Sequence, residues 1–254
     1  MNKIQPKTLF VGKNIVYLPT CHSTNDIASE KIQNGEGIDG TIVITDHQTS
    51  GRGQRGNTWE ALKAQNITMS LILKPSFLRP SEQFDLSMAV STGIYQFFKA
   101  NGTEGVSIKW PNDIYINDKK AGGILIESTI SGNSLNYSVI GIGLNINQNS
   151  FSNPRATSLS VENGGGEMPL DRLVEQLCFY LETAYLSLKN GHKDEIKKKY
   201  LEIMFRAGRL SRFKDESGTF LGTIRGIDPA GKLIVEGEIA EKSYDIKEIE
   251  YLFD

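Results

Sequence analysis

Three short segments carry basic residues next to glycine or amide residues, in an order that suits the binding of an anion. They are residues 51–59 (GRGQRGNTW), 109–113 (KWPND) and 119–123 (KKAGG). Glycine lets backbone N–H groups approach an anion closely, and arginine holds carboxylate or phosphate oxygens in a planar fork. Each segment alone is also typical of a solvated turn. Together they predict one site for a negatively charged substrate.

The last two segments carry a lysine and oxygen donors that could take part in chemistry. Lys120 precedes Ala-Gly-Gly, where missing side chains leave room for a ligand, so its charge could neutralise a developing negative charge. Asn112 and Asp113 offer oxygen atoms for a possible Mg²⁺, and Asp113 could instead accept a proton from a substrate. Both roles for Asp113 stay open. Lys120 is the main catalytic candidate.

Strand and helix patterns alternate around these segments. β-branched and apolar runs predict strands at 41–45, 67–73, 106–110, 114–116, 124–127 and 137–144. Apolar residues at helical spacing predict helices at 81–99 and 170–188, and Ser23 followed by Asp26 predicts the N-cap of a helix that ends near residue 33. The glycine-rich segment is therefore expected between two strands.

The C-terminal part of the chain changes character. From residue 210 onward short strands are separated by the turns DESG at 215–218 and DPAG at 228–231. This rhythm is typical of a small barrel. The sequence therefore predicts a catalytic domain over residues 1–207 and a second domain over residues 208–254.

Composition excludes several classes of protein. The 28 basic and 30 acidic residues give a net charge of −2, so charge does not indicate a partner made of DNA or RNA. No run approaches the roughly 18 apolar residues of a membrane span. Two cysteines are too few for a disulfide framework, and three scattered histidines do not indicate a zinc site. We expect a cytoplasmic protein that binds neither DNA nor membrane.

The order of the motifs resembles the catalytic domain of the biotin protein ligases. The resemblance starts at residues 23–25 (STN) and Gln48, continues through the three segments above, and ends at 141–147 (GIGLNIN). It covers roughly residues 15–160 with specific motifs and the C-terminal fifty residues more loosely. It implies an α+β fold with a mixed or antiparallel central sheet and flanking helices, like that of class II aminoacyl-tRNA synthetases, followed by an SH3-like β-barrel.

The resemblance also implies an activity. Members of this family use ATP to activate biotin as biotinyl-5'-AMP, with Mg²⁺, and transfer biotin to a lysine of a biotin carboxyl carrier protein domain. Repressor-type members carry a helix-turn-helix domain, for which about 22 residues before Ser23 are too few, so we expect the short form. A homodimer stays open, since family members often pair through the sheet next to the active site.

By resemblance, the residues divide into overlapping groups. The residues implied for biotin are Ser23, Thr24, Asn25, Gln48, Gly51, Arg52, Gly53, Lys120 and Gly123, with Ser70 a weaker candidate. The residues implied for ATP and the adenylate are Arg52, Gln54, Arg55, Trp59, Lys109, Asn112, Lys120 and Asn145. Lys120, Arg52 and Asp113 are the catalytic candidates, and Asn112 and Asp113 are the candidates for Mg²⁺. Gln54 and Asn57 depart from the family, which usually has arginines there.

Two other functions remain as alternatives. A lipoate or octanoate ligase or transferase shares this fold, but it is not expected to combine the Gly-Arg-Gly loop with residues 109–113 (KWPND). A biotin-sensing regulator without enzymatic activity is the other alternative, and an intact Lys120 argues against it. Glycines 141 and 143 are expected to let neighbouring backbones approach.

Overall fold

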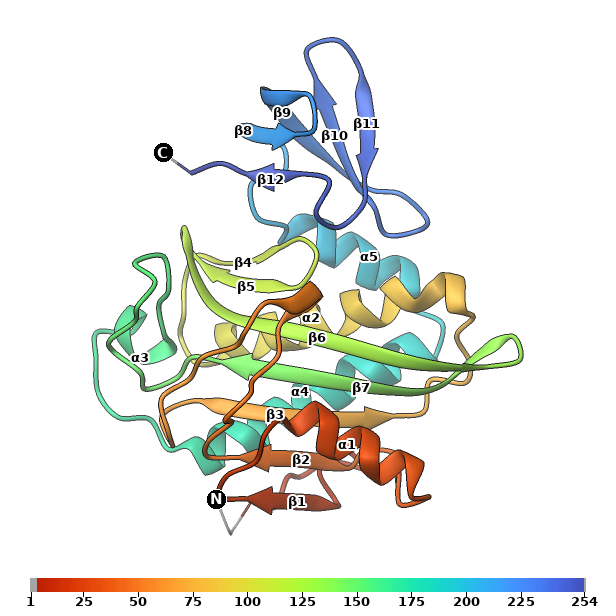
Figure 1. The fold of residues 1–254 in the computed structure, drawn as a ribbon, viewed down its shortest axis with the longest axis vertical. Coiled ribbons are helices and arrows are strands. Elements are labelled where there is room, and N and C mark those ends of the chain that lie inside the picture. Colours follow the sequence, from red (N-terminus) through yellow and green to blue (C-terminus); the bar gives the residue numbers. More distant parts are fainter. Residues whose placement is uncertain (1–3, 254) are drawn as a thin grey trace.

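A mixed seven-stranded sheet forms the centre of the molecule (Figure 1). A computed structural model describes residues 4–253, except for the side chain of Arg55. The strand order is β1-β2-β3-β7-β6-β5-β4, in which β1 and β2 are parallel and all other neighbours are antiparallel. The strands are β1 (Ile15–Leu18), β2 (Ile42–Thr45), β3 (Ile67–Leu73), β4 (Val106–Lys109), β5 (Asp113–Ile116), β6 (Lys119–Ser131) and β7 (Ser134–Leu144).

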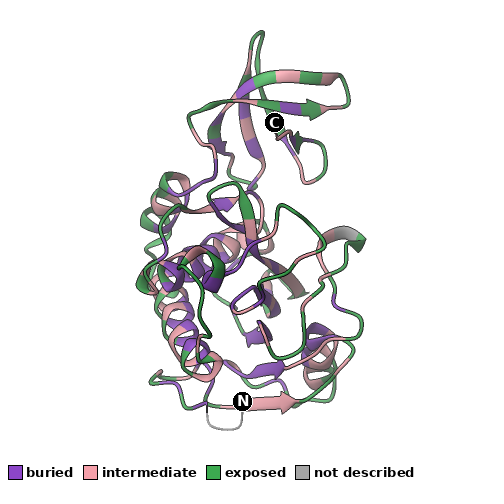
Figure 2. Cartoon of the chain, turned by 90° about the vertical axis from the view of Figure 1, so that its left-hand side faces the viewer, coloured by how far each residue is buried: buried purple, intermediate pink, exposed green. Residues whose placement is uncertain are grey.

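Helices cover both faces of this sheet (Figure 1). α1 (Thr24–Gln33) packs on β2, β3 and β7 on one face, where Ala28, Val43, Ile72 and Val139 form a small core. α2 (Gln83–Ala100) and α4 (Leu170–Lys189) pack together on the other face over the main core. All seven residues of β3 are buried because this strand is covered from both sides. Figure 2 shows buried residues concentrated in the sheet and on the inward sides of the helices.

The contact between α2 and α4 explains a glycine inside a helix. A Cβ atom at Gly93 would lie 3.0 Å from the carbonyl oxygen of Tyr180, so glycine permits the close approach of the two helices. Leu173, Leu177 and Leu181 form the buried stripe of α4. Two shorter helices complete this part of the chain, α3 (Leu159–Glu162) and α5 (Lys193–Glu202).

A five-stranded antiparallel sheet follows α5. Its strands are β8 (Leu210–Asp215), β9 (Gly218–Ile227), β10 (Leu233–Gly237), β11 (Glu241–Tyr244) and β12 (Glu250–Tyr251), in the order β11-β10-β9-β8-β12. The indole Nε1–H of Trp110 donates a 2.9 Å hydrogen bond to the Gly231 carbonyl. Arg206 Nη1 donates a 2.9 Å bond to the Leu252 carbonyl. These bonds fix the small sheet against the end of the large one.

The fold class and most expected elements are confirmed, with three differences. Ser23 occupies the N-cap position of α1, but its side chain makes no capping hydrogen bond. Neither β1 nor α3 was expected from the sequence. β6 begins at Lys119, so residues 119–123 lie in a strand that continues directly from the turn. Division into domains at residues 207 and 208 stays a prediction. None of the helices within residues 4–253 is long and apolar enough to cross a membrane.

Candidate functional site

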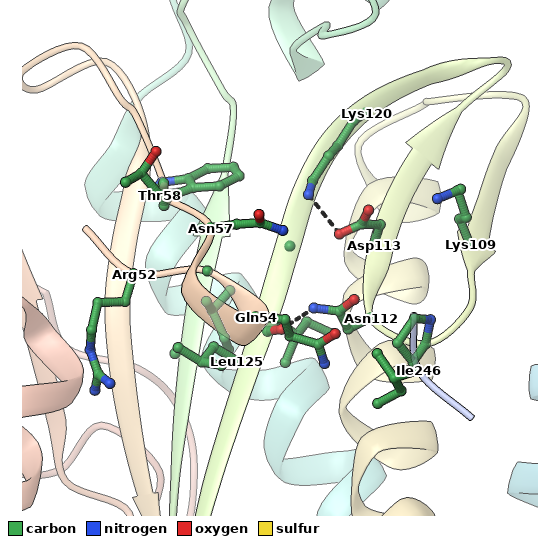
Figure 3. Close-up of a pocket in the computed structure, with 18 of the residues that line it drawn as sticks. Arg52, Gln54, Asn57, Thr58, Lys109, Asn112, Asp113, Lys120, Leu125 and Ile246 are labelled. Atoms are coloured by element: carbon green, nitrogen blue, oxygen red, sulfur yellow. Dashed lines mark hydrogen bonds and ion pairs between the residues drawn. The ribbon is translucent and has the colours of Figure 1, made fainter. Parts of the chain in front are cut away.

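A cavity of about 790 Å³ opens between the large sheet, the loop after β2 and the C-terminal segment (Figure 3). Its walls come from the start of α1, from β3, β5, β6 and β7, from loop residues around η1 (Gln54–Gly56), and from residues between 246 and 253. The volume lies in the range of small-molecule sites. Segments far apart in the sequence therefore meet around one space.

Neutral polar groups gather at the start of α1. The Thr24 backbone N–H and hydroxyl lie 2.8 and 3.1 Å from Gln48 Oε1, to which both donate. The Ser70 hydroxyl on β3 lies 2.7 Å from Thr24 Oγ1 and 2.6 Å from Asn25 Oδ1. Ser23 lines the cavity beside them. Hydroxyls and amides of this kind suit a neutral ring that carries donors and acceptors on one edge.

Two glycines of β7 make room for side chains of this cavity. A Cβ atom at Gly141 would collide with the side-chain amide of Asn25. A Cβ atom at Gly143 would collide with the indole ring of Trp59. The expected approach of two backbones is therefore not the reason for these glycines, since side chains fill the space.

Arg52 is held by two carboxylates. Its Nη1 and Nη2 atoms donate to the two Glu127 oxygens at 2.9 and 2.8 Å, and Nη2 also lies 2.7 Å from Asp26 Oδ1. The Asn25 amide donates to the same Glu127 at 2.7 Å. In Figure 3 the guanidinium points away from Lys120. Arg52 thus fixes the start of the loop to α1 and β6.

Lys120 and Asp113 form an ion pair on the opposite side of the cavity. Lys120 Nζ lies 2.7 Å from Asp113 Oδ1, and a register shift between β5 and β6 brings the two residues into range (Figure 3). A Cβ atom at Gly123 would lie 3.5 Å from both of these atoms, so glycine keeps the space beside the pair open. The Trp59 ring centroid lies 5.9 Å from Lys120 Nζ.

Lys109 lies in a more apolar place. Its Nζ atom is 4.7 Å from the ring centroid of Tyr251 and 5.6 Å from that of Tyr115. Burial lowers the pKa of this ammonium group, and the carboxylate of Asp113 opposes part of that effect. An incoming anion would stabilise the charged form.

Asn112 and Asp113 satisfy part of what a magnesium ion requires. The Asn112 Nδ2–H donates to the Ile124 carbonyl at 2.6 Å, which leaves Oδ1 to accept or to coordinate. In the described part of the chain no group of three or more His, Cys, Asp or Glu could hold a metal. One carboxylate and one amide oxygen fit Mg²⁺ that arrives with phosphates and keeps several waters, because Mg²⁺ rarely needs an all-protein cage.

Most of the candidate residues from the sequence line this cavity, but Gly51, Ser70 and Asn145 do not. Gly51 is buried at the base of the loop, where a Cβ atom would lie 2.9 Å from Gln48 Nε2. Asn145 is buried behind the wall, and its amide donates to the Thr157 carbonyl at 2.9 Å. The side chain of Arg55 lies outside the described residues. Those on the cavity wall are Ser23, Thr24, Asn25, Gln48, Arg52, Gly53, Gln54, Trp59, Lys109, Asn112, Asp113, Lys120 and Gly123.

Three residues of the wall, Arg155, Tyr251 and Phe253, were not expected from the sequence. Arg155 reaches the cavity from the loop before α3, and its guanidinium lies 4.2 Å from the ring centroid of Phe253. Tyr251 and Phe253 belong to the C-terminal segment. The alternation of Tyr251, Leu252 and Phe253 places both rings on one side of an extended segment, which was the available signal.

Comparisons with known proteins agree on a family. The model of the biotin/lipoate A/B protein ligase family matches residues 17–145. The chain is 33% identical over 252 residues to the bifunctional ligase/repressor BirA of Bacillus spizizenii, covering 96% of this chain and 76% of that protein. It is 27% identical over 219 residues to the biotin–[acetyl-CoA-carboxylase] ligase of Mycobacterium tuberculosis, covering 84% and 80%.

A solved structure shows the same fold. The biotin protein ligase of Aquifex aeolicus, in complex with biotin and ATP, superimposes with a TM-score of 0.75. The two chains are 24% identical, and the match covers 94% of this chain and 98% of the other.

Proposed function

This chain belongs to the biotin/lipoate A/B protein ligase family, and we propose that it activates biotin with ATP and transfers it to a lysine of a biotin carboxyl carrier domain. One observation carries the proposal. A neutral hydrogen-bonding cluster at the start of α1 and a group of cations around Lys120 line the same cavity. A ligand with a polar ring at one end and a carboxylate at the other could contact both.

The first reaction joins two anions. A carboxylate oxygen of biotin attacks the α-phosphorus of ATP, the bond from that phosphorus to the bridging oxygen breaks, and pyrophosphate leaves. Lys120 would stand between the carboxylate and the α-phosphate and neutralise the charge that builds up there. Before it contacts the substrates, Lys120 must break the 2.7 Å ion pair between its Nζ atom and Asp113 Oδ1. Asn112 and Asp113 would hold Mg²⁺, which supplies further neutralisation of the phosphates when bound.

The second reaction transfers the acyl group. The amine of the acceptor lysine attacks the carbonyl carbon of biotinyl-AMP, and AMP leaves with the electron pair of the broken bond. The amine must lose a proton, and Asp113 would accept it once Lys120 has turned to the ligand; the 2.7 Å ion pair between the two side chains supports this role. Asp113 would then serve both reactions in sequence.

Arg52 is proposed to close the loop over biotin. To reach the carboxylate of the ligand it must leave Asp26 or Glu127. All three side chains remain more than a third exposed, so each ion pair contributes little and the exchange is inexpensive. The ligand carboxylate would replace one of the two protein carboxylates.

The acceptor is proposed to be a carrier domain of a biotin-dependent carboxylase. The protein is proposed to act in the cytoplasm. A reaction that consumes ATP fits that compartment, as do the free thiols of Cys21 and Cys178.

The test is a reconstituted reaction. The purified protein, ATP, Mg²⁺, biotin and an isolated carrier domain should give a carrier mass increase of one biotin, on one lysine. Replacing biotin with lipoate or octanoate should give none. Modification by lipoate or octanoate in place of biotin would contradict the proposed substrate, and absence of any modification would contradict the proposed reaction.

A further inference from the structure

Four aromatic rings form a cluster beside the cavity. Tyr115 and Phe205 have ring centroids 5.0 Å apart, and Phe253 lies 6.2 Å from Tyr115 and 6.1 Å from Phe205. Tyr251 joins them at 6.2 Å from Phe205. Tyr251 and Phe253 reach the cavity surface. Phe253 is therefore the most exposed ring of this aromatic cluster, since Tyr115, Phe205 and Tyr251 are buried.

Three cations lie on these rings. Lys109 lies over Tyr251, and the Arg155 guanidinium lies 4.2 Å from the centroid of Phe253. Arg206 also lies 4.6 Å from the centroid of Phe253, but it pairs with Asp118 and is not part of the cavity wall. Contacts of this kind hold a cation in place without neutralising its charge. The ring of Phe253 also restricts the flexible arginine side chain, so less conformational entropy is lost when an anion binds.

Arg155 and Lys109 differ from the other cations of the cavity. Arg52 has Asp26 and Glu127, and Lys120 has Asp113. Within residues 4–253, no carboxylate oxygen is found within 4.0 Å of the charged nitrogens of Arg155 or Lys109. Their charge is therefore available for a ligand without the loss of an ion pair.

The backbone fixes Arg155 relative to Lys120. The Lys120 N–H donates to the Arg155 carbonyl at 2.7 Å, and the Thr157 N–H donates to the Lys120 carbonyl at 2.9 Å. The amide of Asn145 donates to the Thr157 carbonyl and holds the same loop. The backbone of residue 155 is thus fixed beside that of the candidate catalytic lysine, and both side chains line the same cavity.

We propose that Arg155 binds the β- and γ-phosphates of ATP, which become the leaving pyrophosphate, and that Phe253 positions it. The inference rests on the proposed function, since it places the α-phosphate at Lys120. A guanidinium fork matches the oxygens of a terminal phosphate, and two uncommitted cations suit a highly charged leaving group. The C-terminal segment acts on the first reaction through Phe253.

Binding measurements separate this role from others. Calorimetric titration of magnesium pyrophosphate, ATP and AMP would compare the wild type with Arg155→Ala, Arg155→Lys and Phe253→Leu. Loss of a charge-assisted bidentate contact should raise the Kd of pyrophosphate and ATP about tenfold in Arg155→Ala. The Kd of AMP should stay unchanged. Arg155→Lys should recover part of the loss, and Phe253→Leu should show a smaller loss of the same pattern.

An exposed arginine distant from the cavity provides the matched control. Arg209→Ala should leave all three dissociation constants unchanged. The proposal is overturned if Arg155→Ala binds pyrophosphate as the wild type does, or if AMP loses as much affinity as ATP, since Arg155 would then act at the nucleoside. These measurements need no turnover. A wild type that binds pyrophosphate but makes no biotinyl-AMP would contradict the proposed function alone.

Discussion

Replacement of Lys120 by alanine should separate catalysis from folding. The ammonium lies 2.7 Å from Asp113 on the cavity wall, with a third of the lysine side chain and a fifth of the aspartate exposed. Two unit charges 4 Å apart interact by about 4 kcal/mol at an effective dielectric constant near 20. Lys120 must break its ion pair with Asp113 before it contacts the substrates, so part of this electrostatic stabilisation is offset. A loss of ~3 kcal/mol remains, or about a hundredfold in the rate of adenylate formation.

The same change should affect stability little. A partly exposed ion pair contributes at most about 1 kcal/mol to the free energy of unfolding. Lys119→Ala is the matched control, because Lys119 is exposed and precedes Lys120 in the same strand. It should retain both activity and stability. Lys120→Arg keeps the charge and should retain more activity than Lys120→Ala.

The assay is biotin-dependent exchange of labelled pyrophosphate into ATP, because it reports the first reaction alone. Urea denaturation would be measured on the same samples. If folded Lys120→Ala forms biotinyl-AMP at the wild-type rate, Lys120 is not the catalytic cation. If Lys119→Ala loses activity to the same extent, the loss reflects the charge of the turn in general.

Three further changes test other parts of the structure. Burial lowers the pKa of Lys109, so this lysine should lose its charge at a lower pH than an exposed lysine does, and the affinity for ATP should fall with it. In Lys109→Arg, calorimetry should find the affinity retained over the same pH range. Parallel losses of affinity in both proteins would refute this. Glu182 is buried and accepts hydrogen bonds from the backbone N–H groups of residues 9–11 at 2.7, 2.8 and 3.0 Å. Urea denaturation should therefore show that Glu182→Ala lowers the free energy of unfolding by about 3 kcal/mol, whereas Glu175→Ala, which removes one exposed hydrogen bond, should lower it by under about 1 kcal/mol. Equal losses in the two variants would count against this. Gln54 lines the cavity where family members usually have arginine. Gln54→Arg should therefore slow the release of preformed radiolabelled biotinyl-AMP several-fold, or by roughly 1 kcal/mol. Equal release rates would show that another group already supplies the charge of the missing arginine.

Local patterns in the sequence were enough to predict the regular elements. Leu173, Leu177 and Leu181 recur at helical spacing, and α4 buries that stripe. The continuous apolar run at 67–73 became β3, which is covered on both faces. β1 could not be predicted, because its four residues are stabilised by parallel pairing with β2, whose position depends on the rest of the sheet.

Side-chain partners distant in the sequence could not be predicted. Arg52 is held by Glu127, 75 residues away, so its type alone gave no indication that its charge is already paired. The amide of Asn145 suited a phosphate equally well, and only the position of the Thr157 carbonyl shows where it donates. The contact of Arg155 with Phe253 joins two segments that are separate in the chain. Most residues that line the cavity could therefore be predicted from the sequence, whereas their hydrogen bonds and ion pairs could not.

The chain has two tryptophans, and each lies at a different junction of the molecule. Both line the cavity, but Trp59 lies near Lys120, whereas Trp110 is 3% exposed and donates to the Gly231 carbonyl between β9 and β10 of the small C-terminal sheet. Indole fluorescence is sensitive to nearby charge and to water, so the two emissions are separate optical reporters. In a Trp59→Phe protein the remaining emission would follow detachment of the small sheet, and in a Trp110→Phe protein it would follow occupation of the cavity. The two indoles thus allow ligand entry and movement of the C-terminal sheet to be compared in time, without an attached dye.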